Sequence, residues 1–506
     1  MAASSSKSRA GERLARWVSP DGGTDSALRM LQALSLAVVG VVVGQLMATG
    51  ALPIKALLLL APFILAGIVI LARYPMLLAY LLLPIFYTNA EGVFGLKTGL
   101  PTGVALFALS LGYYLILAFT NNLKILLHLS SKLFFLFCVV ATFQVSLMPD
   151  RHEGHYEDWI RNMLYTLSAF FMSHLLLTTR ERVEKLAVIL TWTGTFLAVV
   201  NIIEFFDRGL INLSVTPTRS AGLLMNANPS AAAILAAYWI SYFAPQRFLL
   251  IKRLIMFVGI YTTFSRAGLI LYFGILFYLE IFAQRLNMRR LVLSLSFIAL
   301  VVVMASFGRV LVEATNDPMV AKTYTRVVNI VEGNFDDASS AQRRRVIPLQ
   351  FERFKERPLF GWGAGAAGGE DSPHNQLLLI AVEQGLLGVL LFVIFTTSMV
   401  AEILRMPKSP IRSQLIALYL FQVGNMVFSH NLMTFRFFTQ AFALLCIMPV
   451  VYRLAEQPRV AGETTTSPAL PVWKLRGSGS APTRLLERGS NVASTAPVLH
   501  PGGAET

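Results

Sequence analysis

Three arginines and one histidine in this chain have the chemistry needed to act on a negatively charged substrate. Arg219 lies in the segment TPTRSAGLLMNANPS, Arg266 lies in TTFSRAG, and Arg343 begins a run of three arginines. His374 lies in SPHNQLLL, at the start of a long apolar run. A guanidinium group binds phosphate oxygens through paired hydrogen bonds, and a neutral imidazole can take a proton from a hydroxyl group. These residues therefore indicate a phosphate or diphosphate site next to a candidate general base.

Each arginine also has a simpler explanation. An arginine beside hydrocarbon is costly unless it is paired or reaches water, and Arg266 lies at a tight turn between two apolar runs. Its side chain could therefore extend to lipid headgroups. Several arginines on one face of the protein favour a shared anionic ligand instead. We therefore expect Arg219, Arg266 and Arg343 to bind a diphosphate.

The sequence around His374 predicts a neutral imidazole. Ser372 and Pro373 are a suitable N-cap and first helical residue, which would place His374 in the first turn of the following helix. The positive end of the helix dipole disfavours a charged histidine there, and a neutral histidine can act as a general base. The alternative is a hydrogen-bonding residue without a catalytic role. By the same signals, Asn228 and Pro229 are expected to start another apolar helix.

Glu383 is the acidic residue closest to this histidine along the predicted helix, nine residues further on. A carboxylate at this depth is costly without a partner. Because each helical residue adds a rotation of about 100°, Glu383 lies on the opposite face from His374 and cannot orient it directly. We therefore expect Glu383 to bind a buried arginine or backbone donors as a structural residue.

Three other patterns are weaker. GAGAAG, at residues 363–368, matches GxGxxG, but it follows no strand pattern and opens no helix, so we interpret it as a flexible loop. Glu370 and Asp371 could suggest a metal, but no second histidine in the same loop completes a site, and we expect none. His430 and Asn431 form a second His–Asn pair, which is a weaker candidate because no Gly-rich loop precedes it.

The composition indicates a membrane protein. Of the 506 residues, 55% are hydrophobic and only 14% are charged, which is too apolar for a soluble chain of this size. The apolar runs of about 20 residues are unbroken, as in membrane helices, whereas a membrane β-barrel would alternate apolar and polar residues. The two cysteines lie inside apolar runs and provide no disulfide framework. The predicted fold class is all-α.

Apolar runs separated by polar segments predict roughly 12–14 membrane helices. The candidate spans are residues 28–49, 51–72, 75–89, 100–119, 130–148, 159–178, 184–206, 229–245, 249–263, 266–283, 291–308, 375–402, 411–428 and 432–452. The expected order is a cytoplasmic N-terminal segment (1–27), membrane helices (28–308), one large loop (309–374), further membrane helices (375–453) and a disordered cytoplasmic tail (454–506).

The distribution of basic residues predicts the orientation. The formal charge is +15, and lysines and arginines gather in alternate loops, as is typical of loops that face the cytoplasm. This pattern explains the charge without nucleic-acid binding, which we do not expect. It puts both termini in the cytoplasm. Arg219, Arg266, His374 and the 309–374 loop then lie together on the opposite, extracytoplasmic side.

Four segments resemble the bacterial O-antigen ligase and O-antigen polymerase superfamily. PLFGWGAG resembles its Pro-Leu-x-Gly-x-Gly loop, and SPHNQLLLIAVEQGLLG resembles its His-Asn-x-x-Leu helix with a later Glu-x-Gly. TTFSRAG resembles its Ser-Arg-Gly turn, and RSAGLLMNANPSA resembles its Arg-x-x-Gly…Asn segment. The similarity extends approximately over residues 210–400.

This resemblance implies a membrane glycosyltransferase. Proteins of the superfamily move a glycan from an undecaprenyl diphosphate carrier to an acceptor sugar on the periplasmic face of the bacterial inner membrane, without metal or other cofactor. Their helical fold is similar to that of GT-C-type membrane glycosyltransferases. His374 is implied to activate the acceptor hydroxyl. The residues implied to hold the diphosphate are Arg219, Arg266 and Arg343. The supporting residues implied by the same motifs are Asn226, Asn375 and Glu383.

Two alternatives stay open at the level of sequence. Within the superfamily, the product could be a longer O-antigen polymer, a glycan attached to the lipid A core of lipopolysaccharide, an exopolysaccharide or a glycoprotein. A transporter or flippase for the lipid-linked glycan would also need basic residues for the diphosphate. The base predicted at His374 favours an enzyme, because transport needs no base.

Overall fold

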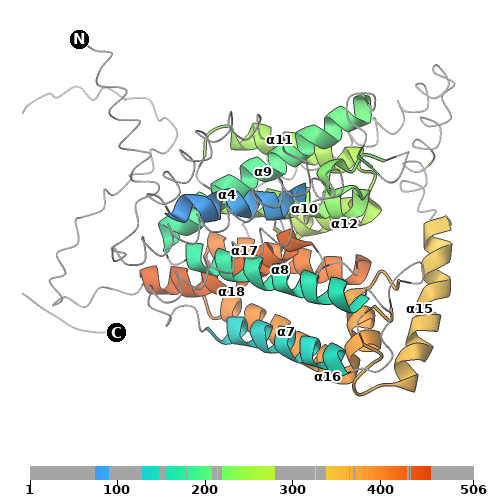
Figure 1. Cartoon of the computed structure of the whole chain (residues 1–506). Helices are drawn as coiled ribbons and strands as arrows, with labels where there is room; N and C mark the ends of the chain where they lie inside the picture. Colours follow the sequence, from blue (N-terminus) through green and yellow to red (C-terminus); the bar gives the residue numbers. More distant parts are fainter. Residues whose placement is uncertain are drawn as a thin grey trace, which may run out of the picture. The chain divides into compact units, whose positions relative to one another are not determined.

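The computed structural model of the chain contains only helices in the part that it describes (Figure 1). The described residues are 75–90, 128–147, 155–177, 179–207, 213–214, 219–244, 246–279, 325, 338–363, 365–367, 372–429, 432 and 435–456. Their elements are α4 (Pro75–Thr88), α7 (Leu129–Leu147), α8 (His155–Leu176), α9 (Arg180–Phe206), η1 (Gly222–Leu224), α10 (Ala227–Ile240), η2 (Ser241–Phe243), α11 (Leu249–Thr262), α12 (Arg266–Tyr278), α15 (Ala338–Glu356), α16 (Gln376–Leu404), α17 (Pro410–Phe428) and α18 (Arg436–Glu456). This composition of elements agrees with the all-α class.

Most of the predicted apolar spans correspond to helices. Each span from 75–89 to 266–283 and from 375–402 to 432–452 overlaps one described helix, apart from 100–119. The spans 28–49, 51–72, 100–119 and 291–308 lie outside the described residues. The bounds differ by a few residues because polar caps extend the helices. For example, α9 begins at Arg180 because the side chain of Thr179 accepts a hydrogen bond from the backbone N–H of Arg182.

Helix α10 lies between α9, α11, α12 and α17 and forms the centre of the described helices. Every residue of α10 except Asn228 is buried. Its alanines allow neighbouring backbones to approach closely, and a Cβ added to Gly194 of α9 would lie only 2.1 Å from the Cβ of Ala237. Close packing therefore fixes the position of α10, and with it the position of Asn228 in the first turn of this helix.

Two of the described helices are long and apolar enough to cross a bilayer. These are α9, with 27 residues, and α16, with 29 residues. At about 1.5 Å per residue, helices of this length exceed the roughly 30 Å of a hydrocarbon core. Length and composition are the only criteria here, so the number of spans and their orientation stay predictions.

In α9 and α16, the predicted site residues lie near one end of the helix, and Arg180 and Arg405 lie at the other end. Helix α9 begins at Arg180, and its last turn contacts the segment 219–222. Helix α16 begins two residues after His374 and ends at Leu404, and Arg405 is its C-cap.

The predicted 309–374 loop contains a helix that its sequence pattern did not predict. Helix α15 lies across the direction of the long helices, at the end where α16 begins (Figure 1). Val346 and Gln350 of α15 are buried, whereas Arg344 and Arg345 are exposed. Contacts divide the chain into residues 1–457 and residues 458–506, and the second unit lies outside the described residues.

Candidate functional site

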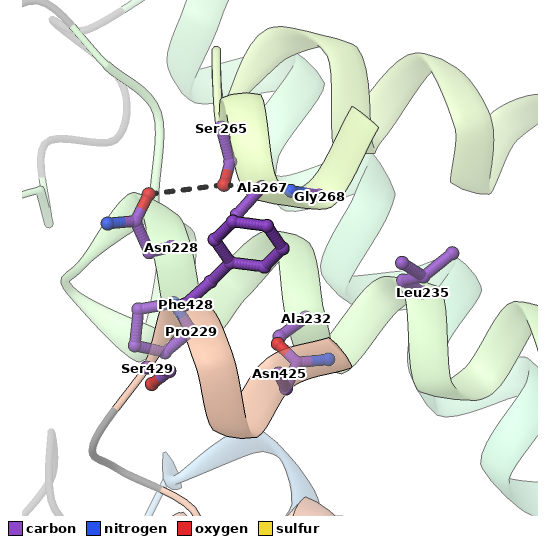
Figure 2. Close-up of a pocket in the computed structure, with 10 residues that line it drawn as sticks. All are labelled: Asn228, Pro229, Ala232, Leu235, Ser265, Ala267, Gly268, Asn425, Phe428 and Ser429. Carbon is purple, nitrogen blue, oxygen red and sulfur yellow. Dashed lines mark hydrogen bonds between the residues drawn. The ribbon is translucent and has the colours of Figure 1, made fainter. Parts of the chain in front are cut away.

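Arg219 is held at a junction between two turns. Its Nε donates to the carbonyl oxygen of Thr263 (2.9 Å), and its Nη2 donates to Oδ1 of Asn228 (2.7 Å). The same Oδ1 accepts a hydrogen bond from Oγ of Ser265 (3.1 Å), as Figure 2 shows. Ser265 is the N-cap of α12, and Arg266 is the first residue of that helix. Asn228 thus joins the turn of Arg219 to the turn of Arg266.

The start of α10 differs from the sequence prediction by two residues. The helix begins at Ala227, and its N-cap is Asn226, whose side chain accepts a hydrogen bond from the backbone N–H of Asn228 (3.1 Å). The prediction that Asn228 is the cap and Pro229 the first residue is therefore wrong. The Asn228 side chain instead accepts from Arg219, so the neighbouring asparagine caps the helix.

A small pocket lies beside this junction (Figure 2). Its polar rim consists of Asn228 and Ser265, from the starts of α10 and α12, and of Asn425 and Ser429, from the end of α17. The cavity volume is about 10 Å³, which is room for about one water molecule. The pocket itself is therefore too small for a sugar, but it shows that the ends of three helices meet next to Arg219.

His374 lies before the helix that it was predicted to begin. Helix α16 starts at Gln376, and Asn375 is its N-cap, accepting a hydrogen bond from the backbone N–H of Leu378 (2.9 Å). His374 has a left-handed backbone conformation (φ 48°), which cannot continue into an α-helix. The prediction that His374 lies in the first turn is therefore wrong. An asparagine next to the histidine caps the helix in place of Ser372.

The environment of His374 favours a neutral imidazole. The residue is half-buried, and burial is the main cause that lowers the pKa of His374 from its usual value, followed by the positive charge of Arg343. A charged form would lose hydration and would be repelled by the guanidinium. Arg343 of α15 is therefore near enough for its charge to act on His374. The structure also gives the predicted neutral state a cause other than the helix dipole.

Helix α16 is broken at Gly385, and the Pro-Leu-x-Gly-x-Gly segment docks on the break. Gly385 has φ 68° and ψ −165°, which interrupts the helical hydrogen bonds. Four backbone hydrogen bonds join the two segments: Trp362 N–H to Val382 O (2.8 Å), Gly363 N–H to Glu383 O (2.9 Å), Leu386 N–H to Pro358 O (2.7 Å) and Leu387 N–H to Leu359 O (3.3 Å). The groups freed by the break are thus satisfied, as buried backbone requires.

Two glycines allow this contact. A Cβ on Gly385 would lie 2.4 Å from the carbonyl carbon of Leu359, and a Cβ on Gly361 would lie 2.5 Å from the carbonyl carbon of Glu383. Both glycines also have positive φ angles. The start of the segment interpreted as a flexible loop is therefore anchored to α16, because Gly363 and Gly365 donate hydrogen bonds to Glu383.

We expect Gly385→Ala to lower the melting temperature of the detergent-purified protein by several degrees. The φ and ψ of Gly385 are essentially restricted to glycine, and another residue there costs about 1–3 kcal/mol before any overlap with Leu359 is counted. Gly274→Ala is the matched control, because a Cβ at that helical glycine meets no atom within 4 Å. Equal melting temperatures for the two variants would contradict this account of the break.

Glu383 binds backbone donors, which is one of the two kinds of partner that its position predicts. Its Oε1 accepts a hydrogen bond from the N–H of Gly365 (2.9 Å). The same loop is tied to α15, because Trp362 Nε1 donates to the carbonyl oxygen of Arg353 (2.8 Å) and the Arg353 side chain donates to the carbonyl oxygen of Ala366 (2.8 Å). These hydrogen bonds connect α15, the loop and α16 into one unit. In the sequence, His374 lies between the loop and the start of α16.

The predicted site residues form two groups at one end of the helices. Arg219 and Arg266 belong to the junction around Asn228, whereas Arg343 and His374 belong to the unit of α15 and α16. The segment after α17 links the two, because Leu432 donates its N–H to the Gln376 side chain (3.0 Å) and the end of α17 lines the pocket beside Asn228. The remaining candidates outside the described residues are Gly368, Glu370, Asp371, His430 and Asn431.

Sequence reasoning missed the role of the Asn228 and Ser265 side chains. Asn228 was interpreted as a cap, and Ser265 only as a part of the turn before Arg266. A usable signal was present, since each is a hydrogen-bonding residue within nine residues of a candidate arginine in an otherwise apolar stretch. Their shared hydrogen bond, however, joins residues 37 positions apart and depends on how α10 packs against α12.

Part of the chain matches a known protein family. Residues 253–393 match the model of a family described as O-antigen ligase. The matched range includes Arg266, Arg343, His374 and Glu383, and Arg219 precedes it. A comparison with curated protein sequences finds no match.

Proposed function

We propose the substrates and mechanism of this chain from its residues 253–393, which match the model of the O-antigen ligase family. The family indicates a membrane glycosyltransferase of the ligase or polymerase type. We propose that the donor is a glycan linked to undecaprenyl diphosphate. The acceptor would be a sugar hydroxyl of a second glycan or of the lipid A core, and the reaction would take place on the periplasmic face of the bacterial inner membrane.

The junction of Arg219 and Arg266 carries this proposal. Asn228 ties the two turns together at the starts of α10 and α12. Helix N-termini and guanidinium groups both attract anions, so a diphosphate is a suitable ligand for this place. Arg266 at the first position of a helix is unfavourable next to the positive end of the helix dipole. An anionic ligand would relieve that repulsion.

His374 is the general base in the proposed mechanism. The acceptor oxygen attacks the anomeric carbon of the donor sugar, and the bond between that carbon and the diphosphate oxygen breaks. The proton of the acceptor hydroxyl moves to the neutral imidazole of His374. The departing undecaprenyl diphosphate keeps the electron pair of the broken bond, and Arg219, Arg266 and Arg343 stabilise the developing charge. No metal ion takes part in this proposal.

A transporter or flippase is the second candidate function. It would use the same arginines for the diphosphate headgroup, but it would not need a neutral histidine next to the acceptor. The low pKa of His374 therefore supports the enzyme.

The test is reconstitution of the full-length protein in liposomes with an undecaprenyl-diphosphate-linked glycan and an acceptor glycan. We expect a larger glycan and free undecaprenyl diphosphate to form in equal amounts, with EDTA present throughout. Movement of the intact donor across the bilayer without release of undecaprenyl diphosphate would favour the flippase instead. Activity that EDTA abolishes and a divalent cation restores would contradict the metal-independent mechanism.

A further inference from the structure

We propose that Glu204 is a positioning residue that holds the segment carrying Arg219 in the conformation that binds the donor diphosphate. This inference rests on the proposed function, because it gives Glu204 a role only through the arginine. Glu204 lies in the last turn of α9 and is fully buried, with 0% of its surface exposed. A buried acidic residue in an apolar helix is costly unless it is fully paired.

The carboxylate of Glu204 is paired entirely with backbone. Its Oε1 accepts hydrogen bonds from the N–H groups of Leu213 and Ser214, both at 2.8 Å. Its Oε2 accepts from the N–H groups of Ala221 (2.7 Å) and Gly222 (2.8 Å). Hydrogen bonds to an ionised acceptor are short and about twice as strong as neutral ones. One side chain therefore ties both sides of the 213–222 segment to the end of α9.

Arg219 lies between the two tied points. Ala221 and Gly222 follow it by only two and three residues, so the Glu204 carboxylate fixes the backbone next to the arginine. Ser220, which directly follows Arg219, is held by the end of α11, because its Oγ donates to the carbonyl oxygen of Thr262 (2.7 Å). The guanidinium of Arg219 donates to both Thr263 and Asn228. It can do so only if the backbone of Arg219 is held in place.

A second contact with α9 supports the same conformation. Gly222 has a positive φ of 52°, and a Cβ there would lie 2.6 Å from Oδ1 of Asn201. Asn201 also exchanges hydrogen bonds with Oγ of Ser230 in α10. Helix α9 thus aligns the segment with the start of α10, where Asn228 receives Arg219. Loops without such ties are usually the mobile parts of a protein.

Glu204→Gln removes the negative charge and one of the two acceptor atoms of the side chain, but it keeps the shape of the side chain. Glu204→Gln keeps the volume, but its amide nitrogen donates hydrogen bonds and cannot accept them, so two of the four N–H groups lose their acceptor. Glu204→Asp keeps a carboxylate that is one methylene shorter. We expect it to retain more donor binding than Glu204→Gln, as rescue by a conservative substitution requires.

The experiment measures binding of undecaprenyl diphosphate to the purified full-length protein. The variants are Glu204→Gln, Glu204→Asp, Arg219→Ala and the double variant Glu204→Gln/Arg219→Ala. Glu402→Gln is the matched control, because Glu402 is also a buried carboxylate but binds Arg405 and Arg453 at the opposite end of α16. Glu402→Gln should lower the stability of the protein and leave the dissociation constant for undecaprenyl diphosphate within about twofold of wild type.

We expect Glu204→Gln to raise the dissociation constant by about 10- to 100-fold, because a misplacement of about 1 Å can cost a factor of about 100. If Glu204 acts through Arg219, the double variant should bind within about twofold of Arg219→Ala alone. The KM for the donor should rise, with the KM for the acceptor unchanged. A merely structural carboxylate would lower protein stability without this dependence on Arg219.

Two results would overturn the inference and a third would remove its basis. Wild-type binding by Glu204→Gln, with weak binding by Arg219→Ala, would show that Glu204 does not position the arginine. The same fold-change for Glu204→Gln in the presence and absence of Arg219 would show that it acts elsewhere. Wild-type binding by Arg219→Ala would instead contradict the proposed function itself. Should Glu204→Gln not fold, Glu204→Asp carries the same comparison in both backgrounds.

Discussion

His374→Ala is expected to reduce glycan transfer by about two to four orders of magnitude, the usual contribution of a positioned general base. The alanine variant should still insert into the membrane and bind undecaprenyl diphosphate, because the proposed diphosphate ligands lie on other turns. His128→Ala is the control, since His128 is a partly buried histidine next to Glu402 at the opposite end of the helices. Near-normal turnover of the His374→Ala protein would contradict the proposed mechanism.

The pH dependence of transfer gives a second readout of the same residue. A base must be neutral, so transfer should fall as the pH drops through the pKa of His374. Burial and Arg343 lower this pKa, and the acid limb should therefore lie below pH 6.5, the usual value for histidine. Arg343→Gln removes a positive charge and should move the limb to higher pH, whatever its effect on the maximal rate. An acid limb that does not move would show that the charge of Arg343 does not act on His374.

Arg219→Ala and Arg266→Ala are each expected to abolish glycan transfer. Arg219 donates a hydrogen bond to Asn228, and Arg266 directly follows Ser265, which donates to the same side chain, so both arginines belong to the turns where the donor diphosphate is proposed to bind. Lysine at either position should restore transfer only in part, because an ammonium group supplies a point charge without the planar fork that matches phosphate oxygens. The measurement is transfer from the undecaprenyl-diphosphate-linked donor at equal protein levels.

Arg247→Ala is the matched control for these variants. Arg247 is exposed and lies between α10 and α11, at the end of α10 opposite to Asn228. Its replacement should leave transfer close to wild type. Full activity in both Arg219→Ala and Arg266→Ala would show that these arginines only reach lipid headgroups, which is the simpler explanation of their position.

The positions of the helices are predictable from sequence because burial and contact with lipid both require continuous apolar surface. The predicted span 411–428 matches α17 (Pro410–Phe428) almost to the residue, and the span predicted from 266 begins where α12 begins. Helix α15 is different, since its sequence is polar and charged. Its burial of Val346 and Gln350 depends on a partner surface that no local pattern reveals.

The helix starts at the site show why local signals fail there. Several residues near each start can cap a helix, including Asn226 and Asn228 before α10 and Ser372 and Asn375 before α16. Which of them does so depends on what else binds the side chain. The side chain of Asn228 accepts a hydrogen bond from Arg219, and Asn226 caps α10 instead. The sequence predicts which types of residue can cap a helix, but tertiary contacts select the residue that does so.

The candidate groups and the ends of the apolar runs at which they lie, three arginines, one histidine and Glu383, could be read from the local sequence, whereas Glu204 could not. The hydrogen-bond partners of these groups follow from how the helices pack. Glu204 meets N–H groups from both sides of the Arg219 segment, and Gly385 meets Leu359 from a loop 26 residues earlier. These contacts form because buried backbone and buried charge must find hydrogen-bond partners, and the nearest available partners are set by packing and not by distance along the chain.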